Sequence, residues 1–356
     1  MRGSTSRLAL GGAAVVLGLG GGAGLAPLPA WIDTGGDDGL VRSEVAFSFT
    51  DERIDESSGL VARGRTFWTV NDSGDEAVLY AVDGRTGDTT GTTSYAGAEP
   101  DDVEALAPGP GATLWVGDIG DNNRDRSTVA VHRVGADGST ARFELAYPDG
   151  AHDAEALLVH PRTGRVLVVS KVPLLGGTVY AAPRRLEEGS VHRMAAVSRV
   201  RGTVTDGAFL PDGRHVVLRT YGSAGVYTYP GFEQVADLEL PDQDQGEAVA
   251  VSRGGEVFLS SEGALSDVLR VTLPASVRSA VAGTASGAPA SASPSPAVSA
   301  APAPEASDPA SDDRGTGAGD GVGLGRPRGY AVAAVLGALV VGALVRAARR
   351  RGRRRR

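Results

Sequence analysis

The chain contains no cysteine and only one lysine, and both absences narrow what it can be. Without cysteine, disulfides, thiolate chemistry and cysteine-ligated zinc are all excluded. An exported protein without disulfides is expected to rely on a large packed fold. The other 34 basic residues are arginine, a bias typical of a GC-rich coding sequence, so Lys171 is a candidate functional residue. The alternative is a chance surface lysine.

The first thirty residues contain no acidic side chain. Two arginines, Arg2 and Arg7, precede an apolar, glycine-rich run over 8–25, and Leu28-Pro29-Ala30 offers a cleavage site. This pattern predicts a signal peptide over 1–30. An uncleaved N-terminal anchor is the alternative, and both place the body of the chain outside the cytoplasm.

Charged residues are also absent from 329–345, and eight arginines follow that stretch. Seventeen residues at ~1.5 Å each span roughly 25 Å, which Tyr330 and a snorkelling Arg346 can extend to the hydrocarbon thickness. We therefore expect one transmembrane helix over 329–346 and a basic cytoplasmic tail over 347–356. No LPxTG-like sortase signal precedes the helix. The sequence thus predicts a single-pass cell-membrane protein whose main domain is extracellular.

The charge of the exported part is strongly acidic. The ends contain ten of the 35 basic residues, so 25 basic residues face 43 acidic ones, a net charge of about −18. Such a domain disfavours nucleic acid and anionic lipid as partners and attracts cations. The partners left open are an extracellular small molecule, a glycan or a protein.

A repeat occupies the region 44–275. Each unit begins with a small or acidic residue followed by an apolar triplet. The five starts are Ser58, Glu104, Glu155, Gly207 and Glu247. Their separations of 46, 51, 52 and 40 residues are typical of propeller blades.

Within each unit, short β-rich runs are separated by Gly, Pro, Asp and Asn, which predicts antiparallel strands. Second strands are expected at 66–70, 113–116, 166–170, 215–219 and 256–260, and third strands at 78–82, 129–134, 178–182, 226–229 and 268–273. Outer strands are expected around Thr92, Phe143, Ala195 and Val235. The last blade is complete only if 45–49 supplies its outer strand, which also removes free sheet edges.

The fold class predicted is therefore all-β: a β-propeller of five blades, each of about four strands, closed by the N-terminal strand, with one C-terminal transmembrane helix. A six-bladed propeller with a degenerate blade and a β-sandwich are the alternatives. Residues 276–328, rich in Ala, Pro, Ser and Gly, are expected to form a disordered spacer.

Several motifs resemble one family. They are Ser58-Gly-Leu with Asn71-Asp-Ser-Gly, Asp102-Val-Glu with Gly117-Asp-Ile-Gly-Asp-Asn, Asp153-Ala-Glu-Ala-Leu with Ser170-Lys171, Val204-Thr-Asp-Gly with Leu218-Arg-Thr-Tyr, and Gln245-Gly-Glu-Ala with Ser261-Glu. Over roughly 55–275 the chain resembles uncharacterised secreted actinobacterial β-propeller proteins, loosely akin to esterase-like phytase propellers. The resemblance implies the fold and no particular activity.

Polar residues recur where first strands begin and second strands end, so a propeller gathers them at one mouth of its axis. The candidate ligand-binding residues are Asp72, Glu104, Asp118, Glu155, Lys171, Asp206, Arg219, Glu247 and Glu262. For a metal the candidates are Glu104, Asp118, Asp121, Glu155 and Glu247. Carboxylates at several rim positions suit calcium, with Lys171 and Arg219 binding an anionic group beside it. Salt bridges between blades, with carboxylates that cap backbone N–H groups, are the alternative use of the same residues.

The sequence contains no complete EF-hand, nucleophile elbow or histidine metal motif. The loop 121–125 has the one-three-five spacing of a calcium loop, but Arg126 replaces the glycine and His132 the bidentate glutamate of an EF-hand, so an ordinary polar loop is expected. Ser73 lies in no nucleophile elbow, and the five histidines show no metal spacing. Trp68 and Trp115 occupy matching strand positions and are expected in the core between blades.

Two functions remain open. The first is an extracellular ligand-binding or scaffolding propeller with a divalent cation at the axial mouth. The second is a metal-assisted hydrolase of phosphate esters or glycosides, with Glu155, Glu247 and Lys171 as catalytic candidates. An enzyme would need two carboxylates directed at one point of a deep axial pocket.

Overall fold

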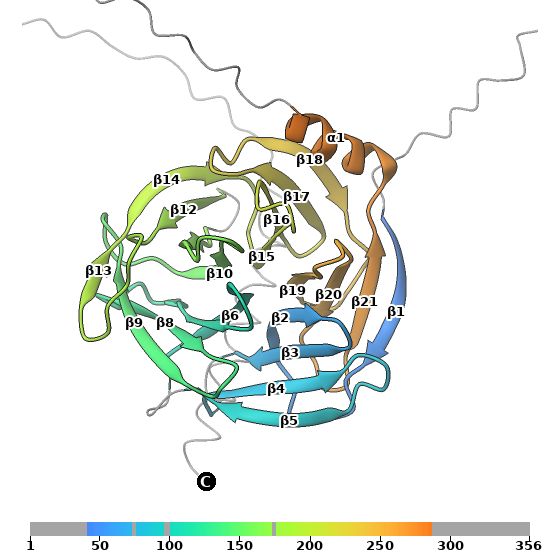
Figure 1. Ribbon diagram of the computed structural model, residues 1–356, viewed down its shortest axis with the longest axis horizontal. Coiled ribbons are helices and arrows are strands. Elements are labelled where there is room, and N and C mark those ends of the chain that lie inside the picture. Colours follow the sequence, from blue (N-terminus) through green and yellow to red (C-terminus); the bar gives the residue numbers. More distant parts are fainter. Residues whose placement is uncertain (1–40, 73–75, 96–99, 173–175, 287–356) are drawn as a thin grey trace, which may run out of the picture. The chain divides into compact units, whose positions relative to one another are not determined.

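The computed structural model describes residues 41–72, 76–95, 100–172 and 176–286. These residues form five small antiparallel sheets arranged as blades around one axis, a β-propeller (Figure 1). Blade 1 contains β2 (Ser57–Arg63), β3 (Thr66–Asn71), β4 (Val78–Asp83) and β5 (Thr89–Ser94). Blade 2 contains β6 (Val103–Pro108), β7 (Leu114–Asp118), β8 (Val129–Val134) and β9 (Thr140–Ala146).

Blade 3 contains β10 (Ala154–Val159), β11 (Val166–Ser170), β12 (Gly177–Ala181) and β14 (Ala195–Val200). Blade 4 contains β15 (Asp206–Phe209), β16 (His215–Arg219), β17 (Ser223–Thr228) and β18 (Gln234–Glu239). Blade 5 contains β19 (Gly246–Val251), β20 (Val257–Ser261), β21 (Asp267–Thr272) and β1 (Arg42–Ser48). The structure thus confirms five blades and, in order, the strands expected within each.

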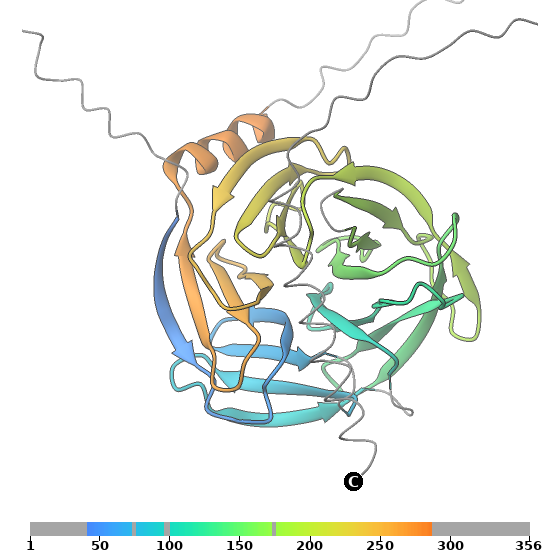
Figure 2. The same ribbon diagram turned by 180° about the vertical axis from the view of Figure 1, so that it is seen from behind.

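The N-terminal strand closes the ring as expected. β1 pairs antiparallel with β21, from Arg42 opposite Thr272 to Ser48 opposite Asp267. Blue β1 and orange β21 lie side by side at the outer edge of blade 5 in Figures 1 and 2. Phe47 is buried, and its ring centroid lies 4.9 Å from that of Phe67 in blade 1. The pairing therefore ties the start of the domain to its end and to the first blade.

The core is divided among the interfaces between blades. Five apolar clusters are found, and each combines residues of two successive blades. An inner strand such as β10 is buried at every position because neighbouring blades cover both of its faces. The outer strand β5 is polar and largely exposed, which suits a sheet edge that faces solvent. Trp115 is buried in one cluster and stacks on Phe143, which confirms its expected place in the core.

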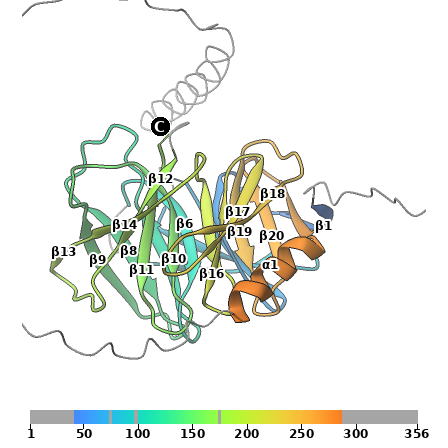
Figure 3. The same ribbon diagram turned by 90° about the horizontal axis from the view of Figure 1, so that it is seen from above.

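Two elements were not expected from the sequence. β13 (Val191–Arg193) pairs parallel with β9 and gives blade 2 a fifth strand. The region expected to start the spacer at 276 instead forms helix α1 (Ala275–Ser286), whose Val277 is buried against the core of blades 4 and 5. α1 packs beside β18 at the rim, as Figure 3 shows. The composition is that of a spacer, but the apolar face of the helix finds a partner in the propeller.

Both expected targeting segments, 1–30 and 329–346, and the spacer beyond residue 286 lie outside the described residues. Within the described part of the chain, no helix is long and apolar enough to cross a membrane.

Candidate functional site

The two ends of the propeller axis differ in chemistry. All five inner strands start at one end, where the second strands finish, and we call this the polar end. Its buried charged residues include Asp72, Asp102, Glu104, Asp118, Asp121, Glu155, Asp206, Arg219 and Glu247. The opposite end forms a pocket of about 380 Å³ lined mainly by apolar residues such as Ala62, Val159 and Leu210. The structure therefore places these candidate residues at one end of the axis.

At the polar end, Lys171 and Glu155 form an ion pair. The Lys171 ammonium donates to Glu155 Oε1, and the side chains are only 12% and 4% exposed. The ammonium also lies over the ring of Tyr221, 5.8 Å from its centroid. Lys171 therefore has neighbours that a chance surface lysine would not have.

The pKa values of this pair reflect burial and mutual attraction. Burial raises the pKa of the Glu155 carboxyl to about 7, against the opposing effect of Lys171. Burial also disfavours the charge on Lys171, but Glu155, Tyr221, Glu247 and Glu104 outweigh it and raise the pKa of the ammonium. Lys171 thus stays protonated at neutral pH, whereas the Glu155 carboxyl titrates near pH 7.

A cluster of three buried carboxylates, which we call the carboxylate cluster, lies at the same end. Asp72 follows β3 of blade 1, and Asp102 and Glu104 lie at the start of β6 of blade 2. One oxygen from each lies within 4.8 Å of the others. Two ligands on opposite sides of a calcium ion, each at about 2.4 Å, are separated by about this distance. The cluster therefore has a spacing that a calcium ion could bridge.

Gly120 makes this close approach possible. A methyl group at Gly120 would lie 2.6 Å from Asp102 Oδ2 and 2.6 Å from Glu104 Oε1. The backbone φ at Gly120 is not positive, so its backbone conformation does not require glycine. Glycine is favoured here because a larger side chain would collide with the two carboxylates. An alanine would push the two carboxylates from their present positions.

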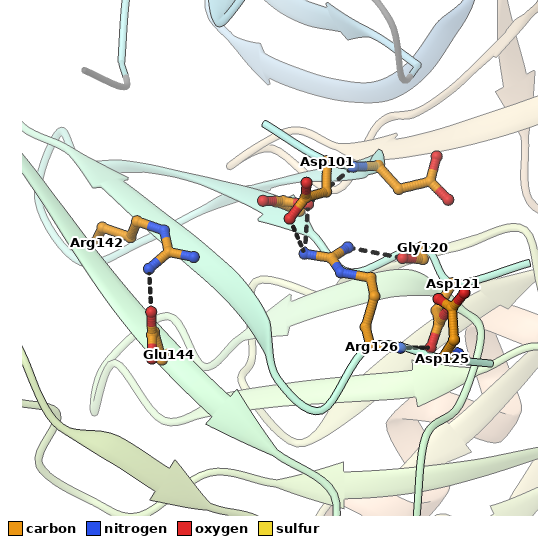
Figure 4. Close-up of polar contacts among 9 residues, drawn as sticks. Asp101, Gly120, Asp121, Asp125, Arg126, Arg142 and Glu144 are labelled. Carbon is orange, nitrogen blue, oxygen red and sulfur yellow. Dashed lines mark hydrogen bonds and ion pairs between the residues drawn. The ribbon is translucent and has the colours of Figure 1, made fainter. Parts of the chain in front are cut away.

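Asp118 and Asp121 have structural roles instead. Asp118 Oδ1 accepts the backbone N–H of Asp102 and pairs with Arg126 at 2.9 Å. Figure 4 shows the Arg126 guanidinium between Asp101 and the carbonyl oxygen of Gly120. These contacts occupy Asp118 and hold the loop against the start of β6.

The Asp121 carboxylate also serves the loop. It accepts the N–H groups of Asp125 and Arg126, each at 3.0 Å (Figure 4). This is a backbone turn capped by a carboxylate, so the loop 121–125 is the ordinary polar loop expected. Among the described residues, neither Asp118 nor Asp121 belongs to the group of carboxylates spaced for a metal ion.

Arg219 is fully buried and joins blade 4 to blade 5. Its guanidinium donates to the carbonyl oxygens of Ala248 and Ser260, at 2.5 and 2.8 Å, and to Gln243. Gly246 leaves room for it, since a methyl group there would lie 2.0 Å from Arg219 Nη2. The carbonyl oxygens therefore occupy Nη1 and Gln243 accepts from Nη2, whereas Nε has no hydrogen-bond partner within the described residues. That Arg219 binds an anionic group stays a prediction.

Asp206 makes a second link between these blades. It is fully buried, and its Oδ2 accepts the N–H of Val249 at 2.8 Å. Burial raises the pKa of Asp206 well above its usual range and lowers that of Arg219 to about 10. Both residues thus act as links between blades, the alternative use that the sequence left open.

The last two candidates lie at blade 5. Glu247 is 5% exposed at the start of β19 and is one of the anions that hold the charge on Lys171. Glu262 is half-buried, and its Oε2 accepts a hydrogen bond from Gln245 at 2.8 Å. Glu247 therefore belongs to the Lys171 surroundings, whereas Glu262 lies at the margin.

Three residues of this end were missed as site candidates. Asp102 and Asp153 each stand two positions before a glutamate that was chosen, and Asp153 accepts the N–H of Asp121 at 2.9 Å. Tyr221, just after β16, lies under Lys171. The repeated Asp-x-Glu at 102–104 and 153–155 was the signal that could have identified both aspartates.

No protein-family model matches the chain, and no curated protein matches its sequence. Among solved structures, the glutaminyl cyclase of Myxococcus xanthus is similar at a TM-score of 0.42 and 11% identity, over 66% of this chain and 97% of that one. The interpretation of the site therefore depends on the geometry described above.

Proposed function

We propose that the chain is an extracellular ligand-binding propeller that holds a divalent cation, with calcium the best fit, at the polar end of its axis. The observation that carries this proposal is the carboxylate cluster of Asp72, Asp102 and Glu104, whose oxygens lie within 4.8 Å of one another although all three side chains are buried. Concentrating buried negative charge is unfavourable unless a cation or protons neutralise it.

The charge balance at this end supports a cation. Glu155 and Glu247 add to the three clustered carboxylates, whereas Arg126 pairs with Asp118 and the charge of Arg219 interacts with Glu247 and Asp206. Lys171 is paired with Glu155, and Glu247 and Glu104 also stabilise its charge. A divalent cation would supply the further positive charge and leave coordination positions for oxygens of a ligand.

A metal-assisted hydrolase is the second candidate. It is favoured by Glu155, because a carboxyl with a pKa of about 7 can exchange protons at neutral pH. Asp72 of the carboxylate cluster is among the charges that raise this pKa, which places Glu155 near the cluster. In this role Glu155 would be the acid or base, Lys171 would hold it in place, and a cation would position a phosphate ester or glycoside.

The location proposed is outside the cell, tethered by the apolar segment 329–346 with the arginine tail in the cytoplasm. Support comes from the acid-free N-terminus and from the arginines that follow residue 345.

Thermal unfolding of the purified domain tests the cation. Calcium at 100 times its Kd should stabilise the wild type by ~2.7 kcal/mol and raise its Tm, because it binds the folded state. Glu104→Gln and Gly120→Ala should abolish most of that gain. Gly91→Ala is the matched control, since a methyl group there meets nothing within 4 Å. A wild-type Tm that calcium and magnesium both leave unchanged would refute the proposal.

A further inference from the structure

A second site lies away from the polar end, between blades 3 and 4. A pocket of about 550 Å³ is formed there by the β10–β11 turn, the segment after β12 and the β17–β18 turn. Lys171 follows β11 at the polar end, whereas His160 and Arg165 of the pocket lie at the other end of β10 and β11. Six strand residues at ~3.3 Å each place the two sites roughly 20 Å apart. The pocket volume lies in the range of small-molecule sites.

One wall of the pocket is aromatic. Tyr229 contacts His160 and Phe232, with ring centroids 5.1 and 6.1 Å away, and all three residues line the pocket. The ring centroid of Phe209 lies 5.1 Å from that of Tyr229 and 5.2 Å from that of His160. His160 and Tyr229 are tilted at 47° to each other, and the other ring pairs are edge to face. Rings packed in this way form an apolar surface on which a planar group can stack.

His160 is fixed as a neutral part of this wall. Its Nε2 lies 3.1 Å from the carbonyl oxygen of Gly213, and its Nδ1 accepts the backbone N–H groups of Arg162 and Thr163. Because Nδ1 is an acceptor, Nε2 carries the proton, and burial lowers the pKa of the ring. Both nitrogens are occupied, so His160 offers a ring face and no charge.

Three arginines complete the lining: Arg165, Arg184 and Arg185. In the described part of the chain, no ion pair joins any of them to a carboxylate. Arg184 and Arg185 are exposed and Arg165 is half-buried. In an exported part with a net charge of about −18, three such arginines beside one aromatic wall form a local positive site.

We infer that this pocket, which we call the arginine pocket, is a binding site for an aromatic anion: a planar ring that stacks on the Tyr229 wall and carries a phosphate, phosphonate, sulfate or carboxylate bound by the arginines. A guanidinium donates two parallel hydrogen bonds to such groups, and its planar face also tolerates a neighbouring ring. The site differs from the polar end in the sign of its charge, so it recognises a ligand of its own. The inference does not depend on the cation proposed above.

Three probes separate the contributions of ring and charge. Phenylphosphonate carries both, methylphosphonate carries only the anion, and benzyl alcohol only the ring. Titration calorimetry in calcium-free buffer prevents cation-bridged binding at the polar end. Phenylphosphonate should bind at least tenfold more tightly than either other probe. Equal affinities for the two phosphonates would overturn the aromatic part of the inference.

Variants then locate the binding. The exposed pair Arg184→Gln/Arg185→Gln should fold normally and weaken phenylphosphonate binding at least tenfold. Arg85→Gln, at an exposed arginine of blade 1, should leave it unchanged, as should Glu104→Gln at the polar end. Tyr229→Leu should lower the preference for phenylphosphonate over methylphosphonate. If the double variant binds like the wild type, or if Glu104→Gln abolishes binding, the arginine pocket is not the site.

Discussion

The Lys171 ammonium donates to the Glu155 carboxylate at the polar end of the axis, and both side chains are at least 88% buried. The two residues stand sixteen positions apart, at the end of β11 and the start of β10. The hairpin of blade 3 therefore places the single lysine of the chain beside the Glu155 carboxyl. Burial raises the pKa of this carboxyl to about 7.

Removing the lysine should expose the energetic coupling of this pair. Lys171→Met leaves Glu155 as a buried carboxylate without its partner, so at pH 8 we expect a loss of ~3–5 kcal/mol in the free energy of unfolding. The double variant Lys171→Met/Glu155→Gln removes the buried charge as well and should recover part of the loss. Urea unfolding of the wild type, Lys171→Met, Glu155→Gln and the double variant gives the coupling free energy of the pair by a double-mutant cycle. Additive losses would mean that the two residues do not interact.

The pH dependence of stability should carry a contribution from Glu155. The carboxyl has an ordinary pKa of 4.5 and a folded-state pKa of about 7, so between these values the folded state binds more protons than the unfolded state. Stability from this group is then present below about pH 4.5 and is lost as the pH rises toward 7. Urea unfolding of calcium-free protein from pH 4.5 to 8 should show this fall, with a smaller slope in Glu155→Gln. Glu188→Gln, at an exposed position, should keep the wild-type slope.

Closure by β1 should make a large contribution to stability. Phe49, directly after β1, is 1% exposed, so Phe49→Ala should cost ~3–5 kcal/mol. Val45→Ala, at a position of β1 that is 55% exposed, should cost less than ~1 kcal/mol. Deleting 288–312, which leaves α1 intact, should not change the melting temperature. Equal losses for the two point variants would show that the strand does not close the ring in solution.

The membrane topology is tested with fusion reporters in cells. A reporter after Arg356 should be active only in the cytoplasm, and one at residue 300 only outside. Cytoplasmic activity of the reporter at residue 300 would contradict export of the propeller.

Much of the fold follows from the sequence because β-rich runs and turn residues repeat at blade length. The expected strands at 166–170 and 215–219 match β11 and β16 at both ends. β13 was not predicted because a strand of three residues is too short to show an alternation of apolar and polar side chains. Its parallel pairing with β9 also depends on how blade 3 packs against blade 2. α1 was missed because Val277 and Val281 show their role only once β18 is beside them.

The sequence predicted where the candidate residues lie, but not which groups their side chains contact. The repeat identified Glu104, Glu155 and Glu247 as residues of one end, and all three are buried there. It could not show that Arg219 turns toward backbone carbonyls, because that depends on the gap left by Gly246 of the next blade. It also missed Asp102, whose proximity to Asp72 arises from packing between blades 1 and 2.

Crystals of the propeller grown with calcium or terbium test the central claim most directly, because anomalous scattering locates the ion without reference to stability. We predict one strong anomalous peak about 2.4 Å from oxygens of Asp72, Asp102 and Glu104, and its absence in crystals of Glu104→Gln. A wild-type map without a peak among these three carboxylates, at a calcium concentration that saturates ordinary extracellular sites, would contradict the account.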